Sequence, residues 1–205
     1  MYTVVGDPRN RTLRVMWMLE ELGQTYALEL AAPQSDRMRA VNVTGKAPTL
    51  LVDGAEVNDS VAILAFLADR HDALTHPAGS VARGRQDACV QFVVDEMEGA
   101  CWTAAKHRFM LPEDKRAEVE PACRHEWDMA MDRLARKLGA GPFLTGEILT
   151  VADLLAAHTL GWGMKMFKWP VPEGPLTDYL ARVTGRPAMA AAVARGKAEV
   201  AAAAA

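Results

Sequence analysis

The chain has 205 residues, of which 50% are hydrophobic and 24% charged, and this balance excludes a disordered chain. Its formal net charge is −3 at pH 7 and its basic residues are scattered, which argues against nucleic acid or an anionic membrane as a partner. The three cysteines and five histidines have no metal-ligand spacing, so we expect buried reduced thiols and no metal site. No apolar run reaches the roughly 18 residues that span a bilayer and no signal peptide begins the chain, so we expect a cytoplasmic protein.

The first 30 residues predict a βαβ unit. A β-branched run at 2–5 predicts a strand, because glycine and proline follow it before any helix can begin. From Thr12 the sequence TLRVMWMLEEL is apolar over most of its circumference and stops at Gly23, which predicts a largely buried helix. Alternation over 25–30 predicts a second strand that is parallel to the first.

A hairpin and a helix complete this first part of the chain. The polar stretch 31–45 predicts a loop with at most one irregular helical piece. Residues 49–57 then predict two antiparallel strands joined at Asp53-Gly54, which suits a two-residue turn. Good N-cap residues precede apolar residues at helical spacing, so a helix is expected over about 60–70.

The rest of the chain predicts helices and no convincing strand. Residues 73–82 lose periodicity, which predicts a linker, and farther along Thr150 and Asp153 have the spacing of a capping box. We therefore expect a βαβ–ββα domain over 1–72, a linker, and an all-helical domain over 83–205. The expected helices cover residues 83–109, 113–138, 150–160, 176–184 and 187–200.

Four segments in chain order resemble motifs of the glutathione transferase family. The family's first helix is similar to NRTLRVMWMLEELG at 10–23, and its strand entry is similar to NVTGKAPTLLVDG at 42–54. Its acidic-Ser helix start resembles NDSVAIL at 58–64, and its capping-box helix resembles PFLTGEILTVADLLAAH at 142–158. This resemblance covers essentially the whole chain. It implies a thioredoxin-like α/β domain followed by an all-helical domain, glutathione as co-substrate, a role in detoxification and a homodimer.

The resemblance implies how the first domain holds the cysteinyl part of glutathione. In the family, the peptide bond before the proline that matches Pro48 is cis. This geometry would present Ala47 so that its backbone N–H and C=O pair with the cysteinyl unit like an added strand. Without the resemblance, we would interpret Pro48 as the start of an edge strand.

Anchors for the charged ends of glutathione also come from the resemblance. Ser60 and the N-terminus of its helix are expected to bind the γ-glutamyl carboxylate, and Asp59 the ammonium group. Lys46, assisted by Arg37, is expected to bind the glycyl carboxylate. Taken alone, Asp59 and Ser60 form an N-cap pair and Lys46 is a solvated loop lysine, so both interpretations stay open here.

The group that activates the thiol departs from the family pattern. No tyrosine ends the first strand, and Asn10 stands where the serine of the family's Ser-Arg-x-x-Arg helix entry aligns. The amide of Asn10, the hydroxyl of Thr12 and the charge of Arg11 are the candidate thiolate partners, and the helix N-terminus adds positive potential. The alternatives are Asn10 as a plain N-cap and Arg11 as a surface residue beside Arg9 and Arg14.

An apolar second substrate is expected between the domains, against the later helices. Aromatic and methionine side chains suit a pocket for varied hydrophobic electrophiles, although at helical spacing they are also typical of a core. The candidate pocket residues are Trp102, His107, Phe109, Met110 and Trp162, with Met164, Phe167 and Trp169 farther along.

These features favour an enzyme that adds the glutathione thiolate to a hydrophobic electrophile. One alternative is the glutathione-dependent reduction of disulfides or peroxides, and another is a non-catalytic protein that binds glutathione or a hydrophobic ligand. A thioredoxin-like oxidoreductase with its own redox cysteine is excluded, because no cysteine precedes Cys89.

Overall fold

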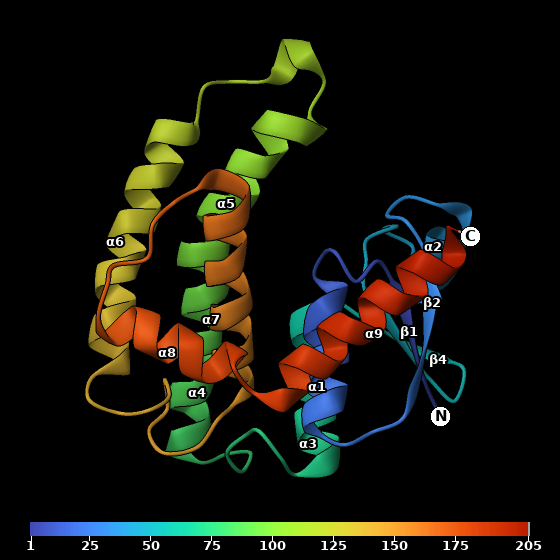
Figure 1. Cartoon of the computed structure of the whole chain (residues 1–205), viewed down its shortest axis with the longest axis horizontal. Coiled ribbons are helices and arrows are strands. Elements are labelled where there is room, and N and C mark those ends of the chain that lie inside the picture. The colour runs from blue at the N-terminus through green and yellow to red at the C-terminus, as the bar shows by residue number, and fades with distance from the viewer. Residues whose placement is uncertain (205) are drawn as a thin grey trace. The chain divides into compact units, whose positions relative to one another are not determined.

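The computed structural model describes residues 1–204, and the chain forms two compact units. The first unit joins residues 1–75 to residues 184–204, and the second covers residues 76–183. All four strands lie in the first unit, and the second is built from helices (Figure 1). The expected fold class, an α/β thioredoxin-like domain followed by a helical region, is confirmed.

The first unit is organised around a four-stranded sheet with the order β2-β1-β3-β4. β1 runs parallel to β2 and antiparallel to β3, and β3 pairs antiparallel with β4, which confirms the βαβ–ββα order. Val4 lies opposite Leu28 on one side and Leu50 on the other, and its side chain is fully buried because β1 is a central strand. The strands are β1 (Tyr2–Gly6), β2 (Tyr26–Leu30), β3 (Thr49–Val52) and β4 (Ala55–Asn58).

The described part of the first unit also contains the helices α1 (Thr12–Glu21), α2 (Asp36–Val41), α3 (Ser60–His71) and α9 (Pro187–Ala203). The α1 helix packs against α3 and against α9, so it is covered on more than the face that meets the sheet. Five consecutive α1 residues, 15–19, are completely buried as a result. This burial fits the expectation from its sequence, which is apolar over most of the helix circumference.

The domain limits differ from those expected at the C-terminal end of the chain. The expected helical domain ran to residue 205, but α9 clusters with the first unit, and Figure 1 shows it lying along α1. The physical reason lies in α1: a helix that is apolar almost all round needs a second partner besides the sheet, and α9 supplies part of that cover.

The second unit contains helices interrupted by π-helical turns. Its helices are α4 (Val81–Phe92), α5 (Gly99–Ala105), α6 (Glu120–Leu138), α7 (Val151–Trp162) and α8 (Pro175–Thr184), with π-helical turns at Val93–Glu98, Lys106–Met110 and Gly163–Phe167. The helix expected from residue 113 begins only at Glu120. The Arg116 side chain donates to the Leu111 carbonyl, and the Ala117 N–H donates to Nδ1 of His107, so local bonds hold the preceding segment out of the helix.

The expected capping box at the start of α7 is present. The Asp153 carboxylate accepts hydrogen bonds from the Thr150 N–H at 2.8 Å and the Thr150 hydroxyl at 3.1 Å. It also accepts from the Leu144 N–H at 2.9 Å and the Tyr179 hydroxyl at 3.0 Å. Asp153 therefore ties three segments of the second unit together, which a local capping box alone does not require.

The three cysteines are free and buried, and burial raises the pKa of the Cys89 and Cys123 thiols. Among residues 1–204, no helix is long and apolar enough to cross a membrane. Within the same range, no three His, Cys, Asp or Glu side chains are grouped so that they could hold a metal ion.

Candidate functional site

The turn between β1 and α1 is the first part of the candidate site. The Asn10 N–H donates to the Asp7 carbonyl at 3.1 Å, which closes a turn with Pro8 at its second position. The Asp7 carboxylate accepts from the Arg9 guanidinium at 2.6 and 2.9 Å, and these bonds hold the pKa of Asp7 below its usual value. Both a backbone hydrogen bond and side-chain hydrogen bonds therefore stabilise the turn.

The Asn10 side chain has a defined orientation. Its Oδ1 atom accepts from the Thr12 N–H at 2.9 Å and from the Thr12 hydroxyl at 2.8 Å. Because a backbone N–H can only donate, the amide atom that faces it is the oxygen, and the NH₂ group points away. No group in residues 1–204 accepts a bond from that NH₂. The free donor therefore lies at the start of α1, where the helix adds positive potential.

Thr12 has a different environment from Asn10. Its side chain is fully buried, and its hydroxyl lies so close to Gly6 that a Cβ at Gly6 would be 2.2 Å from Oγ1. The hydroxyl is committed to Asn10, so Thr12 acts as an anchor for the Asn10 side chain. The third candidate, Arg11, is half-buried just before the helix.

A cis peptide bond joins Ala47 to Pro48, as the family resemblance implied. Ala47 lies just before β3 and is half-buried, and within residues 1–204 its backbone groups bond to no other backbone group. Asn42 holds the preceding loop, because its side-chain amide donates to the Lys46 carbonyl at 2.7 Å and its Oδ1 accepts from the Thr44 N–H at 3.0 Å. The backbone of Ala47 is thus presented by a braced loop.

The N-terminus of α3 forms the third part of the site. Asp59 has a positive φ of 73°, and its Oδ1 caps the helix by accepting from the Val61 N–H at 2.8 Å and the Ala62 N–H at 3.3 Å. Ser60 is buried, and its Oγ accepts from Nη1 of Arg14 at 3.2 Å. Since a guanidinium can only donate, the Ser60 hydroxyl keeps its own proton for another acceptor.

The two cations expected near the glycyl carboxylate differ in their partners. Arg37 is exposed and donates to the Glu29 carboxylate, with 2.8 Å between Nη2 and Oε2. This ion pair holds the pKa of Glu29 below its ordinary value. Lys46 is exposed, and no carboxylate among the described residues pairs with its ammonium group. Lys46 is therefore the more available of the two.

Comparisons with known proteins find glutathione transferases. A family model described as "Glutathione S-transferase, N-terminal domain" matches residues 10–70. Glutathione S-transferase theta-1 of Bos taurus is 31% identical over 156 residues, which cover 71% of this chain and 65% of that protein. The crystal structure of a glutathione transferase from Methylococcus capsulatus is 25% identical, with a TM-score of 0.80 over 96% of this chain and 99% of that one. The chain therefore resembles glutathione transferases in both sequence and fold.

The match with the bovine theta-1 transferase spans less than two thirds of that relative's length, namely 65%. A glutathione transferase family member from Pseudomonas fluorescens, solved with two glutathione molecules bound, shares the fold with a TM-score of 0.78 over 93% of this chain and 91% of that one. Its sequence identity is 18%, so this likeness concerns the fold alone.

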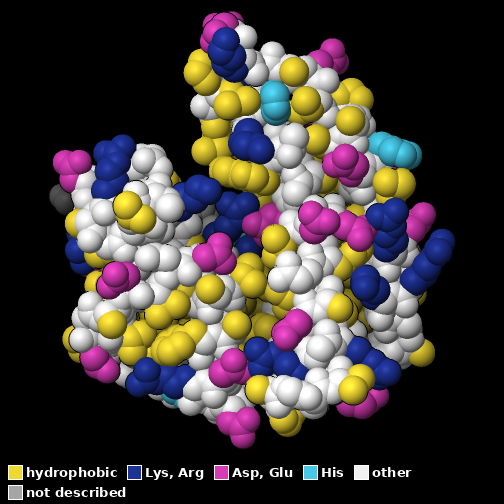
Figure 2. Space-filling model, turned by 180° about the vertical axis from the view of Figure 1, so that it is seen from behind, with side chains coloured by type: hydrophobic (Ala, Val, Ile, Leu, Met, Phe, Trp, Pro, Cys, Tyr) yellow, Lys and Arg dark blue, Asp and Glu magenta, His cyan; other side chains and the backbone are white. Residues whose placement is uncertain are grey.

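The residues expected to line an apolar pocket fall into separate groups. The rings of Trp102 and Trp162 pack with their centroids 6.4 Å apart, and the Trp162 indole N–H donates to the Met166 sulfur at 3.0 Å. Phe109 and Met110 are 55% and 59% exposed at the end of the π-helical turn after α5. Figure 2 shows exposed hydrophobic side chains scattered among charged ones on the face it draws.

The other expected pocket residues have structural roles in the second unit. His107 accepts the hydrogen bond from Ala117 described above. The later aromatic residues belong to the core, since Phe167 and Trp169 are buried and stack with ring centroids 4.6 Å apart. The structure therefore brings Trp102 and Trp162 together and assigns Phe167 and Trp169 to packing.

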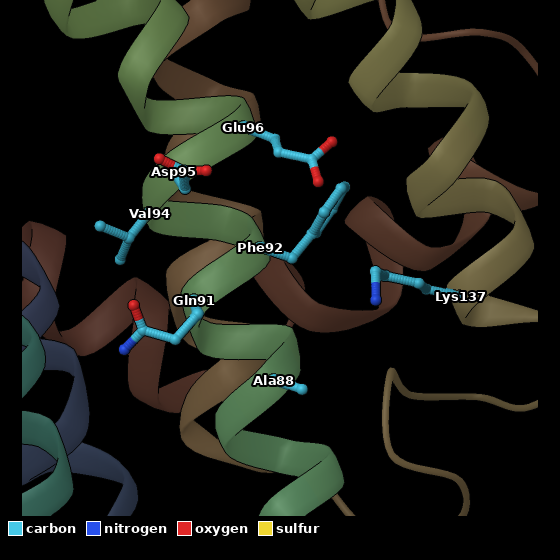
Figure 3. A pocket seen from close by; sticks show the side chains of 7 residues that line it. All are labelled: Ala88, Gln91, Phe92, Val94, Asp95, Glu96 and Lys137. Atoms are coloured by element: carbon cyan, nitrogen blue, oxygen red, sulfur yellow. The ribbon is translucent and has the colours of Figure 1, made fainter.

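A hollow of about 440 Å³ lies elsewhere in the second unit, beside α4 and its π-helical turn. Figure 3 shows Phe92 and Glu96 on the side that faces Lys137 of α6, and the Lys137 ammonium lies 5.0 Å from the centre of the Phe92 ring. None of the residues expected for the apolar substrate lines this hollow. Its lining consists of Ala88, Gln91, Phe92, Val94, Asp95, Glu96 and Lys137.

Three contributors to the site were not anticipated as such from the sequence. Arg14, for which no role was expected from the sequence, is fully buried and contacts Ser60. Asn42 braces the loop before Ala47, and Gly6 makes room for Thr12. Only Arg14 carries a sequence signal: it is a cation inside a helix that is apolar over most of its circumference, where a charge needs a partner.

Proposed function

We propose that this chain is a glutathione transferase, which binds glutathione and activates its thiol with the side-chain amide of Asn10. The observation that carries the proposal is the orientation of Asn10, whose oxygen is held by Thr12 while its NH₂ group stays free beside the N-terminus of α1. A free thiol has a pKa near 8.5, so an amide donor and a helix N-terminus next to the sulfur would stabilise the thiolate.

The other two parts of the site fit the rest of the tripeptide. The unbonded backbone groups of Ala47 suit the cysteinyl unit, as an added strand would. The free proton of the Ser60 hydroxyl and the N-terminus of α3 suit the γ-glutamyl carboxylate. The second oxygen of Asp59 suits the ammonium group, because only Oδ1 caps the helix. Lys46 suits the glycyl carboxylate, and Arg37 would have to leave Glu29 to assist.

In the proposed reaction, the thiol releases its proton to solvent and the resulting thiolate attacks an electrophilic carbon. With a chloronitroaromatic, the carbon–sulfur bond forms, the carbon–chlorine bond breaks, and chloride leaves with the electron pair of that bond. The protein contributes positioning and the lowered thiol pKa, and no residue of the chain becomes covalently attached. The Trp102–Trp162 pair and the exposed Phe109 and Met110 suit an apolar electrophile. We propose that the enzyme acts as a homodimer, as its family does, and monomer mass in sedimentation would contradict this.

The test uses the purified chain with glutathione and a chloronitroaromatic, and in parallel with a mixed disulfide. Turnover of the chloronitroaromatic supports the transferase, and turnover of the disulfide alone supports a reductase. Thiolate absorbance of bound glutathione separates both from a binding-only protein, in which the thiol pKa stays unshifted. In Asn10→Ala, glutathione binding should persist while turnover falls. Unchanged turnover would show that Asn10 does not activate the thiol.

A further inference from the structure

The C-terminal helix α9 touches the turn that carries Asn10. Gly196 of α9 is buried, and a Cβ built on it would lie 2.7 Å from Cβ and 3.2 Å from Cγ of Pro8. The next atom, the terminal methyl of Met16 in α1, would be 3.6 Å away. The backbone of α9 therefore rests directly against Pro8, at a distance that only glycine allows.

Glycine at this position is explained by packing. Gly196 lies inside a 17-residue helix and its φ is in the ordinary helical region, so no turn requires it. Alanine is a much better helix former than glycine, so local preference would favour alanine here. By contrast, a Cβ on Gly84, inside α4, would meet nothing within 4 Å.

The helix that carries Gly196 is itself held in place. The Arg186 guanidinium, just before α9, donates two bonds of 2.7 Å to the Glu21 carboxylate at the end of α1. The Arg195 guanidinium lies 3.8 Å from the centre of the Tyr26 ring and donates to the Tyr26 carbonyl in β2. Two charged side chains thus fix α9 against α1 and β2, one of them next to Gly196 in the chain.

Pro8 and Asn10 belong to the same turn, so a displacement of Pro8 also displaces Asn10. Pro8 is the second residue of the turn that the Asp7–Asn10 hydrogen bond closes, and Asn10 is its last residue. Thr12 then anchors the Asn10 side chain from the other direction. The position of the Asn10 amide thus depends on two contacts. On one side α9 packs against the turn, and on the other side Thr12, which packs closely against Gly6, binds the Asn10 oxygen.

We infer that α9 is a positioning element of the thiol site: through the Gly196–Pro8 contact it sets the place of the turn that aims the Asn10 amide at the glutathione sulfur. This inference rests on the proposed function. Gly196 and Pro8 touch neither glutathione nor the reacting atoms, so they act only through Asn10. Misplacing a donor by about 1 Å can cost a hundredfold in rate, so a small shift of this turn has a measurable effect.

The test compares wild type, Gly196→Ala and the control Gly84→Ala. Each variant adds one methyl group inside a helix, but only the first meets Pro8. We expect Gly196→Ala to lower kcat roughly tenfold or more and to reduce the thiolate fraction of bound glutathione, with its Kd changed by less than about threefold. Gly84→Ala should match wild type in all three measurements.

Further variants separate positioning from a loss of folding. Pro8→Gly removes both atoms that the new methyl group would meet, so the double variant Pro8→Gly with Gly196→Ala should show no further loss relative to Pro8→Gly alone. If Gly196→Ala does not fold, Arg195→Met tests the same inference. This substitution weakens the attachment of α9 without adding volume, and it should also lower the thiolate fraction of bound glutathione. Unchanged kcat and thiolate fraction in a folded Gly196→Ala, or in Arg195→Met, would overturn the inference. Wild type that binds no glutathione would instead refute the proposed function.

Discussion

Nη1 of Arg14 lies 3.2 Å from Oγ of Ser60, and both side chains are buried. This contact links α1, whose start carries Asn10, to the N-terminus of α3, which suits the γ-glutamyl carboxylate. The donor geometry matters, because a guanidinium that donates to Oγ leaves the serine proton for the ligand. The same helix thus serves the thiol end and the γ-glutamyl end of the proposed site.

Replacing Arg14 by methionine should weaken glutathione binding. The substitution keeps an apolar stem but removes the donor and the positive charge behind Ser60. A hydrogen bond to a charged group contributes about 1.5–3 kcal/mol, so we expect Kd to rise about 10- to 100-fold in titration calorimetry. Ser60→Ala should raise Kd as well, and the double variant should lose less than the sum of the two. The exposed Arg39→Met is the control, and equal Kd values for the Arg14 and Arg39 variants would contradict the role.

Asn10→Asp removes the amide donor of Asn10 and keeps an oxygen that can accept hydrogen bonds from Thr12. An aspartate oxygen can still accept from the Thr12 N–H and hydroxyl, but it offers no NH₂ group and adds a negative charge near the sulfur. The pKa of bound glutathione should therefore rise to about 8.5 or above, and kcat should fall about 100-fold, as it does when one electrostatic donor is lost. Thiolate absorbance against pH measures the shift. A pKa equal to that of wild type would show that the amide does not face the sulfur.

Two glycines in neighbouring turns of the second unit should respond in opposite ways. A Cβ on Gly163 would lie 2.4 Å from the ring of Trp127, which is fully buried and donates from its indole N–H to the Pro170 carbonyl. Gly163→Ala should therefore destabilise the protein by about 1–3 kcal/mol. A Cβ on Gly161 meets nothing within 4 Å, so Gly161→Ala should be neutral or stabilising. Thermal unfolding measures both, and equal destabilisation would contradict the packing described.

Stability should depend on pH through Asp153. Burial raises the pKa of this carboxyl above its ordinary value of 3.8, even though it accepts four hydrogen bonds. Folding therefore takes up a proton in the interval between 3.8 and the raised pKa, and the free energy of unfolding falls as the pH rises through it. Asp153→Asn cannot titrate and should lack this slope. Parallel pH profiles of unfolding for the two proteins would contradict the raised pKa.

Much of the fold follows from local sequence signals. The strand at 2–6, the helix that stops before Gly23 and the hairpin at Asp53-Gly54 each depend on residues a few positions apart, and all are present. The predicted start of α6, at residue 113, was wrong by several residues, since the helix begins at Glu120. Hydrogen bonds from Arg116 and Ala117 hold the preceding segment out of the helix. Those bonds join side chains to backbone groups five and ten positions apart, and helix propensity does not describe such contacts.

The site was less predictable than the fold. Family motifs led to the cis peptide before Pro48 and to the helix start at Ser60, both of which the structure contains. The packing of α9 on α1 was missed, because an alanine-rich helix shows almost no apolar stripe and the close approach at Gly196 becomes visible only when Pro8 is placed beside it. Short-range patterns carry no information about such contacts.

The central claim is that the turn, the cis-proline edge and the start of α3 together bind glutathione as a thiolate. Titration calorimetry of the purified chain with glutathione, combined with thiolate absorbance of the complex across pH, tests it directly. We predict saturable binding and thiolate formation at a pH below the thiol's usual pKa of about 8.5. Absence of any binding heat, or a bound thiol that titrates like free glutathione, would contradict the account.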